Sequence, residues 1–125
     1  MMMRASLSVL VIVVAGSAQA RWKPEYAYLP QEVRDWYAHA ELTESAQRRF
    51  GFKSCCAHSD VVHTRFRVSK SDGGDHWEWL NNGEWQEVPA DIIHMGEHAP
   101  DGQATLFVVP GTLQPTCFYP PDGGI

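Results

Sequence analysis

The residues best suited to chemistry cluster in one short segment, from position 55 to position 63. Five side chains in these nine positions are possible metal ligands: Cys55, Cys56, His58, Asp60 and His63. Thiolate together with imidazole suits copper or zinc. Structural zinc sites, however, favour cysteines separated by about two to four residues, whereas these two are adjacent. The segment therefore predicts either a structural role without any cofactor or, as an alternative, a Cu or Zn site or a thiol-active centre.

A third cysteine, Cys117, gives this adjacent pair a distant partner. A bridge between Cys55 and Cys56 would strain the peptide that joins them, because bridged Cα atoms normally lie about 5.5 Å apart. A bridge from either residue to Cys117 is more natural, and closing so long a loop is worth roughly 4 kcal/mol by the chain-entropy estimate. We favour Cys56–Cys117 and keep Cys55–Cys117 open. The remaining thiol is expected to be buried and inert.

The first twenty residues have the pattern of a secretory signal peptide. A positively charged head precedes an apolar run, and Ala18-Gln19-Ala20 offers a cleavage site before Arg21. The apolar run is far shorter than the roughly 20 residues that cross a bilayer. We therefore expect residues 1–20 to be removed and residues 21–125 to form a single disulfide-closed domain without a stable membrane anchor. The protein is then periplasmic or secreted, where a suitably placed cysteine pair is normally a disulfide.

The charge balance limits the classes of partner. Without the signal peptide, the chain carries nine Lys and Arg residues against 15 Asp and Glu residues. Nucleic acids and anionic lipids are bound through basic surface, so both are disfavoured as partners. The acidic residues are spread along the chain and form no run, which is typical of a solvated surface.

Two helices are predicted near the start of the mature chain. After Pro30, five apolar positions recur at helical spacing and predict an amphipathic helix of about eleven residues: Leu29, Val33, Trp36, Tyr37 and Ala40. Thr43 is placed to cap a second, short helix, and Gly51 is placed to end it.

The remainder of the chain has the patterns of β strands. Residues 62–68 alternate between apolar and polar side chains, and Asn82-Gly83 between two aromatic-rich segments is a strong signal for a hairpin. Residues 105–109 and 116–119 predict two further strands. The expected fold class is α+β, with the N-terminal helical segment packed on a small antiparallel β-sheet or barrel of five to six strands.

Three tryptophans of this hairpin are candidates for binding a partner. Trp77 and Trp79 are two residues apart on one strand and so share a face, and we expect Trp85 to join them from across the hairpin. Such a cluster often stabilises a sheet, but an exposed member would make this face the best candidate surface for another envelope protein or peptide.

A catalytic role has little support in the sequence. Residues 94–98 match H-x-x-E-H, the ligand spacing of one class of zinc peptidase. That chemistry requires a helix, whereas Gly96 lies inside the motif and Pro100 follows it, so His94 and His98 are expected in a loop. Because no serine stands in an activation motif and no triad can be assembled, we lean toward a protein that is not an enzyme.

The order of these motifs resembles a group of small exported proteins from alphaproteobacteria. The shared features are a helix followed by Ser54-Cys55-Cys56, the segment from Gly83 to His94, and the ending Cys117-Phe118-Tyr119-Pro120-Pro121. Some members carry a further cysteine where this chain has Val61, and that difference leaves an odd number of thiols here. The resemblance implies export of a small domain and supplies no substrate, cofactor or catalytic residue.

Overall fold

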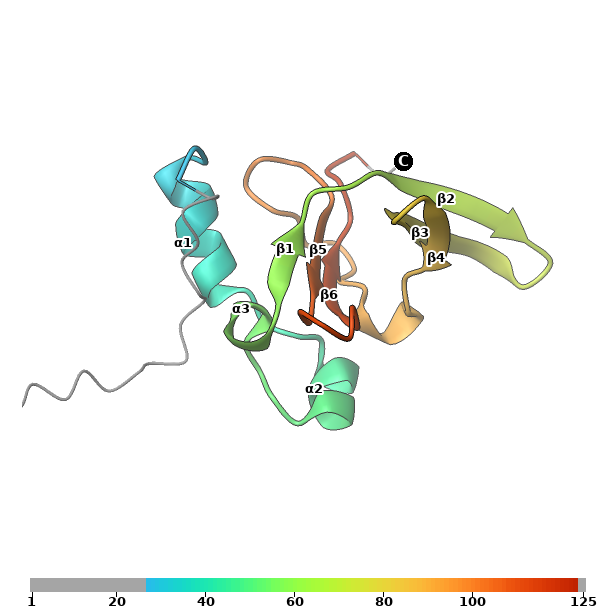
Figure 1. Cartoon of the computed structure of the whole chain (residues 1–125), viewed down its shortest axis with the longest axis horizontal. Helices are drawn as coiled ribbons and strands as arrows, with labels where there is room; N and C mark the ends of the chain where they lie inside the picture. The colour runs from blue at the N-terminus through green and yellow to red at the C-terminus, as the bar shows by residue number, and fades with distance from the viewer. Residues whose placement is uncertain (1–26, 124–125) are drawn as a thin grey trace, which may run out of the picture.

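The computed structural model describes residues 27–123, and these residues form three layers (Figure 1). Helix α1 lies on one side, a central sheet in the middle and an outer sheet on the far side. In chain order the elements are α1 (Gln31–His39), α2 (Glu44–Phe50), α3 (Cys55–His58), β1 (Asp60–Val62), β2 (Phe66–Ser71), β3 (Gly74–Asn81), β4 (Glu84–Glu87), the 3-10 helix η2 (Ala90–Ile92), β5 (Thr105–Val108) and β6 (Pro115–Tyr119). The α+β class is confirmed.

The two predicted helices are present, and their ends have clear local causes. Helix α1 begins directly after Pro30 and ends before Ala40, whose backbone is extended, so it is slightly shorter than expected. In α2, the Thr43 hydroxyl accepts a hydrogen bond from the amide of Ala46 at 3.1 Å. Gly51 then ends the helix in the left-handed conformation, at φ 81°, which glycine adopts without steric cost.

The central sheet is antiparallel, in the order β1-β5-β6, and is buried on both faces. Phe107 faces the helices, where its ring lies 5.9 Å from that of Tyr37. Phe118 faces the outer sheet, where its ring lies 5.4 Å from that of Trp77. All four residues of β5 are buried, which explains why this strand reads as a continuous apolar run and not as an alternation.

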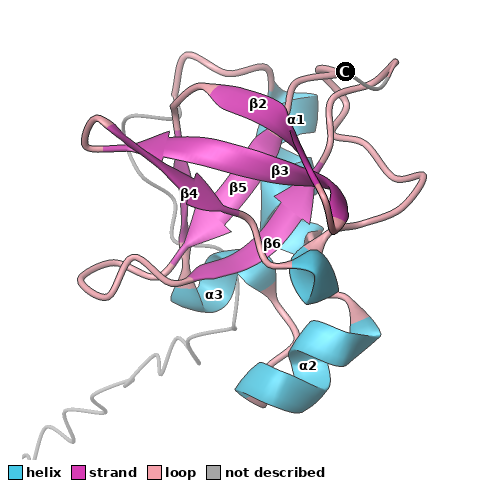
Figure 2. Cartoon of the chain, turned by 90° about the vertical axis from the view of Figure 1, so that its right-hand side faces the viewer, coloured by secondary structure: helices cyan, strands magenta, loops and turns pink. Residues whose placement is uncertain are grey.

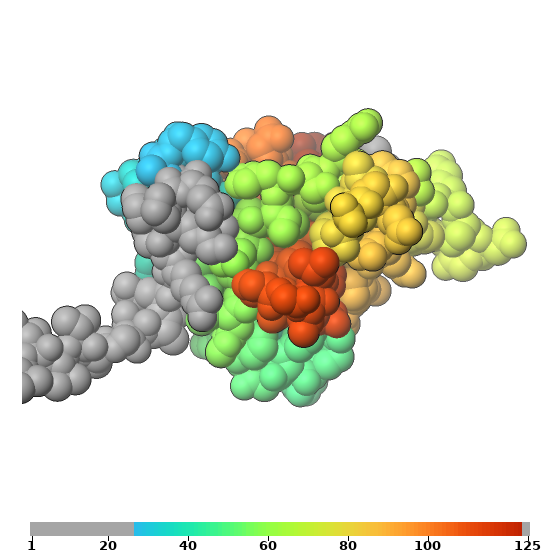
Figure 3. Space-filling view, viewed as in Figure 1, coloured from blue at the N-terminus to red at the C-terminus, as the bar shows by residue number. Residues whose placement is uncertain are grey.

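The outer sheet is an antiparallel meander in the order β2-β3-β4, and its strands cross in front of β5 and β6 (Figure 2). The predicted hairpin joins β3 to β4, with both turn residues at positive φ: 51° at Asn82 and 83° at Gly83. The connection between β2 and β3 is equally tight, since Ser71 pairs with Gly74, and this end of the hairpin projects from the body of the molecule (Figure 3).

One expected strand is split in two. The alternation over residues 62–68 predicts a single strand, but β1 ends at Val62 and β2 begins at Phe66, and they belong to different sheets. The residues between them carry the chain across: the Thr64 hydroxyl donates to the carbonyl of Leu80, and the Arg65 carbonyl accepts from the Leu80 amide at 3.0 Å. The six strands of the described chain therefore form two sheets and no closed barrel.

The expected signal peptide, residues 1–20, lies outside the described residues. Within residues 27–123, no helix is both long enough and apolar enough to span a membrane.

Candidate functional site

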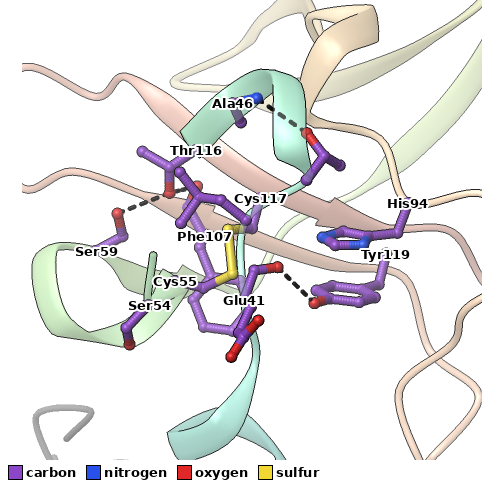
Figure 4. The surroundings of a disulfide bond; sticks show 12 residues. Glu41, Ala46, Ser54, Cys55, Ser59, His94, Phe107, Thr116, Cys117 and Tyr119 are labelled. Carbon is purple, nitrogen blue, oxygen red and sulfur yellow. Dashed lines mark hydrogen bonds between the residues drawn. A yellow bond between two sulfur atoms is a disulfide. The ribbon is translucent and has the colours of Figure 1, made fainter. Parts of the chain in front are cut away.

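The disulfide joins Cys55 to Cys117, with 6.0 Å between their Cα atoms (Figure 4). The favoured Cys56–Cys117 pairing is therefore wrong, and the alternative is correct. The reason is the helical turn α3, which the sequence patterns do not predict. Adjacent residues of a helix point about 100° apart, so only one cysteine of the pair can face β6. Cys56 stays outside the disulfide and is 2% exposed.

The surroundings of the bridge make it a junction between the helices and the central sheet. The amide of Cys55 donates to the carbonyl of Ala40 at 2.9 Å, which ties α3 to the end of α1. On the β6 side, the hydroxyls of Ser59 and Thr116 share a buried hydrogen bond of 2.8 Å. These two contacts hold the helices and the central sheet together around the disulfide.

The predicted copper or zinc ligands do not come together. Cys55 is consumed by the disulfide and Cys56 is buried, whereas His58 and His63 are both exposed. The His58 ring lies 4.2 Å from that of Phe52, and His63 lies 3.5 Å from the Tyr28 hydroxyl. In the part of the chain that the structure describes, no three His, Cys, Asp or Glu side chains are grouped to hold a metal ion. Asp60, the fifth predicted ligand, belongs to no such group either.

The three tryptophans do not share a face, so that expectation is also wrong. The two-residue turn pairs Leu80 with Trp85 and Trp79 with Gln86. Because directly opposite residues lie on the same face, Trp85 points away from Trp77 and Trp79. Trp79 is 2% exposed between the two sheets, and Trp77 is half-buried against Phe118.

The opposite face of the outer sheet has a different character. The Arg67 guanidinium lies 4.1 Å from the centre of the Trp85 ring and donates to Glu78 at 2.7 Å. This hydrogen bond and charge hold the pKa of Glu78 below its ordinary value. The aromatic ring on this face is thus covered by a paired cation and is less available to a partner.

An apolar groove opens where Trp77 meets the C-terminal prolines. We call it the Trp77 groove, and its volume is about 460 Å³. The side chain of Met95, 86% exposed, stands beside it. The residues lining the groove are Val68, Asp75, His76, Trp77, Glu87, Val88, Ala90, Ile93, His94, Met95, Gly96, His98, Pro120 and Pro121. The carboxylates that line the groove are those of Asp75 and Glu87, and no Lys or Arg lines it.

A second hollow lies on the other side of the strip formed by Ile93, His94 and Met95. We call it the acidic cleft, and its volume is about 520 Å³. It is lined by Trp36, His39, Ala40, Glu41, Leu42, Thr43, Glu44, Gln47, Ile93, His94, Met95, Glu97 and Tyr119. Three of these residues are glutamates and none is Lys or Arg; one of the glutamates, Glu41, has Lys53 at 3.6 Å.

His94 and Tyr119 both line this cleft, and Figure 4 shows their rings lying against each other. Their rings are stacked 3.9 Å apart and nearly parallel, and the Tyr119 hydroxyl donates to the Glu41 carbonyl at 2.9 Å. Nδ1 of His94 lies 3.5 Å from a carboxylate oxygen of Glu97, and the backbone carbonyl of Glu41 also interacts with the buried ring.

Burial sets the charge state of both rings. It lowers the pKa of His94, and the Glu97 carboxylate and the Glu41 carbonyl oppose only part of this effect. Burial also raises the pKa of Tyr119 well above its ordinary value. Both side chains are therefore neutral at pH 7.

The H-x-x-E-H segment is a loop, as expected. Its two histidines have separate environments, because Nδ1 of His98 lies 3.0 Å from the carbonyl of Pro120. Sequence patterns drew attention to His94 but not to Glu41 or Tyr119. The contact between Glu41 and Tyr119 joins residues 78 positions apart, so no sequence spacing indicates it. The only sequence signal is that Tyr119 is an aromatic residue in the last predicted strand.

Comparison with known proteins adds no relative. No protein-family model matches the sequence, and neither curated proteins nor solved structures give a match.

Proposed function

We propose that this protein is an exported, non-catalytic domain that binds an extended, apolar and basic peptide segment of another envelope protein in the Trp77 groove. The observation that carries the proposal is the apolar lining of this groove, with Met95 exposed at its side. A large exposed thioether beside an aromatic wall is typical of surfaces that bind varied apolar chains.

Two further features favour a peptide of this chemistry. In the described chain, β2 pairs with β3 along one side, so its other backbone edge is an edge of the sheet, and Val68 of β2 lines the groove. An extended peptide can add to such an edge while its side chains enter the neighbouring pocket. Asp75 and Glu87 supply negative charge, and a basic residue in the peptide would complement them.

The proposed location of the protein rests on the sequence. The signal-peptide pattern of residues 1–20 and the resemblance to small exported alphaproteobacterial proteins support a periplasmic or secreted protein. The disulfide is consistent with an oxidising compartment. The proposal does not use the thiol-active alternative, since Cys55 is bridged and Cys56 is buried.

The test is selection from a random short-peptide display library on the immobilised oxidised domain. We expect apolar sequences with at least one basic residue to be enriched, and the chosen peptide to lose at least about fivefold in affinity for Met95→Asn and for Pro121→Ser.

Leu113→Asn is the matched control for Met95→Asn. Leu113 is likewise an exposed apolar loop residue, 46% exposed, outside the groove. Its φ of 58° is one that asparagine accepts readily. Equal losses for both variants, or enrichment of acidic peptides, would rule the groove out as the binding surface.

A further inference from the structure

The outer sheet has two open backbone edges, one on each side. It runs in the order β2-β3-β4, and in the described chain neither β2 nor β4 pairs with a further strand (Figure 2). The central sheet differs, because its β6 edge is covered: the amide of His94 donates to the carbonyl of Phe118 at 2.9 Å. An exposed strand edge is a template to which another chain can add.

At the β2 edge, alternate residues present their backbone groups outward. Antiparallel strands exchange hydrogen bonds at every second pair. The amide of Leu80 donates to the carbonyl of Arg65 at 3.0 Å, so Arg65 and every second residue after it bond to β3. The amides and carbonyls of Phe66, Val68 and Lys70 therefore point away from β3, and no backbone group of the described chain pairs with them.

The same rule exposes a shorter row at the β4 edge. The amide of Val88 donates to the carbonyl of Trp77 at 2.8 Å, so Val88 and every second residue before it bond to β3. The backbone groups of Trp85 and Glu87 point away from β3 and have no backbone partner in the described chain. Because this row is short, a contact through the two edges has to be a weak one.

The side chains give the two edges opposite charge. Exposed Arg65, Arg67 and Lys70 lie on or next to β2, which has no acidic residue. Exposed Glu84 and Glu87 lie on β4, which has no basic residue. Of these five residues, only Arg67 forms a salt bridge within the described chain.

The signs of the charges determine which edges can meet. Charged edge strands normally keep the sheets of two copies apart. Two β2 edges would bring positive charges together, and two β4 edges would bring negative charges together, so both pairings are destabilised. A β4 edge and a β2 edge bring unlike charges together. The partner that these edges fit is therefore a second copy of this chain.

The strand directions determine how two copies are arranged. Strands β2 and β4 are both antiparallel to β3, so they run the same way. With the helices of both copies on the same side of the sheet, β4 of one copy lies parallel to β2 of the next. Arg67 and Glu87 are both level with Glu78, so the unshifted arrangement places Glu87 of one copy beside Arg67 of the next.

We propose that the domain associates with copies of itself, the β4 edge of one copy adding in parallel to the β2 edge of the next. Each added copy leaves one edge of each kind open, so the contact is heterologous and continues from copy to copy. The outer sheets then join into one twisted sheet.

This association goes beyond the binding of a peptide, and the two are tested separately. Both use the β2 edge, so a neighbouring copy and a bound peptide exclude each other there. At about 0.5 M salt the attraction between the exposed charges is screened, and peptide affinity is measured on single copies. Absence of peptide binding under that condition leaves the test of association intact.

The experiment reverses the charge of one edge at a time and then mixes the variants. The β2-reversed variant carries Arg65→Glu and Lys70→Glu, and the β4-reversed variant carries Glu84→Lys and Glu87→Lys. Sedimentation equilibrium at low salt is expected to give the wild-type oxidised domain an average mass that rises with concentration beyond that of a dimer. Each variant alone is expected to associate at least about tenfold more weakly, since its two edges carry the same sign.

An equimolar mixture of the two variants is expected to regain the wild-type mass, because every β4 edge then meets a β2 edge of opposite charge. A variant that fails to fold could not be rescued in this way. Glu32→Lys/Glu44→Lys is the matched control: it changes the net charge as the β4-reversed variant does, at exposed positions of α1 and α2. It is expected to associate at least as strongly as the wild type.

Four results would overturn the proposal. The wild type stays monomeric at low salt, or its mass levels off at that of a dimer, which indicates that like edges meet. The mixture stays monomeric. The control loses association as much as the β4-reversed variant, which would reduce the effect to net charge.

Discussion

The two sheets of this protein are similar in size and opposite in environment. The central sheet is buried on both faces and is tied to the helices through Cys55–Cys117. The outer sheet buries one face, through Phe66, Trp77 and Trp79, and leaves Arg67 and Trp85 on the other. Stability is thus concentrated in the central sheet, whereas the hollows open where the outer sheet and the loops meet it.

This difference separates residues that look alike in sequence. From the sequence, the three cysteines are similar candidates for the disulfide, and the three hairpin tryptophans are similar candidates for binding a partner. Their positions in the fold distinguish them. All three cysteines are buried, but only Cys55 and Cys117 form the disulfide, and of the tryptophans Trp79 belongs to the interior. Another tryptophan, Trp77, reaches the groove, and a third, Trp85, lies under an arginine on the solvent side. Residue type alone therefore does not identify a binding surface in a small domain.

The largest expected effect is removal of the disulfide. The double variant Cys55→Ala/Cys117→Ala is expected to lose about 4 kcal/mol of unfolding free energy, because the bridge closes a loop spanning 62 positions. Cys56→Ala, also buried, is expected to lose only about 1 kcal/mol, since it removes one sulfur atom from the core. Urea unfolding measures both. A loss for Cys56→Ala as large as for the double variant would mean that the wrong cysteine has been assigned to the bridge.

A second comparison uses the tryptophans of the outer sheet. Trp79→Leu is expected to cost about 2 to 3 kcal/mol, because it leaves a cavity between the sheets. Trp85→Leu is expected to cost less than about 1 kcal/mol, since that ring is half-exposed and covered only by Arg67. Thermal unfolding monitored by circular dichroism compares them. Equal losses would contradict the opposite orientation of the two rings.

The third prediction concerns pH. His94 has a lowered pKa in the folded state, so between pH 7.5 and pH 5.5 the unfolded chain takes up a proton near pH 6.5 that the folded protein excludes. The free energy of unfolding should fall over this range and level off below the folded-state pKa.

The matched variant is His94→Gln, which cannot titrate. Its urea midpoint is expected to depend less on pH than that of the wild type. Other titratable groups lie near the ring and also contribute to the pH dependence: Glu97 and Glu41 on the cleft side, and His76, His98, Asp75 and Glu87 on the groove side. The contribution of His94 is therefore the difference between the pH curves of the wild type and the variant. Parallel curves would show that His94 is not the titrating group.

The smallest effect is expected on the solvent face of the outer sheet. Arg67→Gln removes the pair with Glu78, in which the arginine side chain is 47% exposed and the carboxylate 14% exposed, and ion pairs at the surface contribute little because water and salt screen them. The unfolding midpoint should change far less than for Trp79→Leu. A comparable change would place this face in a buried environment and break the distinction between the two sides of the sheet.

The local elements were predictable from local signals. Asn82-Gly83 predicted a hairpin because both residues tolerate positive φ, and Thr43 and Gly51 predicted the ends of α2. The class and the strand number followed from these patterns. By contrast, the break between β1 and β2 leaves no mark in the alternation, because the alternation in burial continues through the linking residues 63–65.

The candidate site was less predictable, for a geometric reason. The choice of Cys55 over Cys56 depends on the phase of a single helical turn, and the face of Trp85 depends on one position of register. The groove and the cleft are assembled from residues far apart in the chain, as with Glu41 and Tyr119. No spacing in the sequence records such contacts.

The most direct test of the central claim, that the groove side of the outer sheet and not its Trp85 side binds the partner, is the pair of indole N–H resonances of Trp77 and Trp85. A peptide selected on the domain is titrated into ¹⁵N-labelled protein. The account predicts that the Trp77 indole signal shifts on binding while that of Trp85 stays in place. A shift of Trp85 with Trp77 unchanged would contradict it.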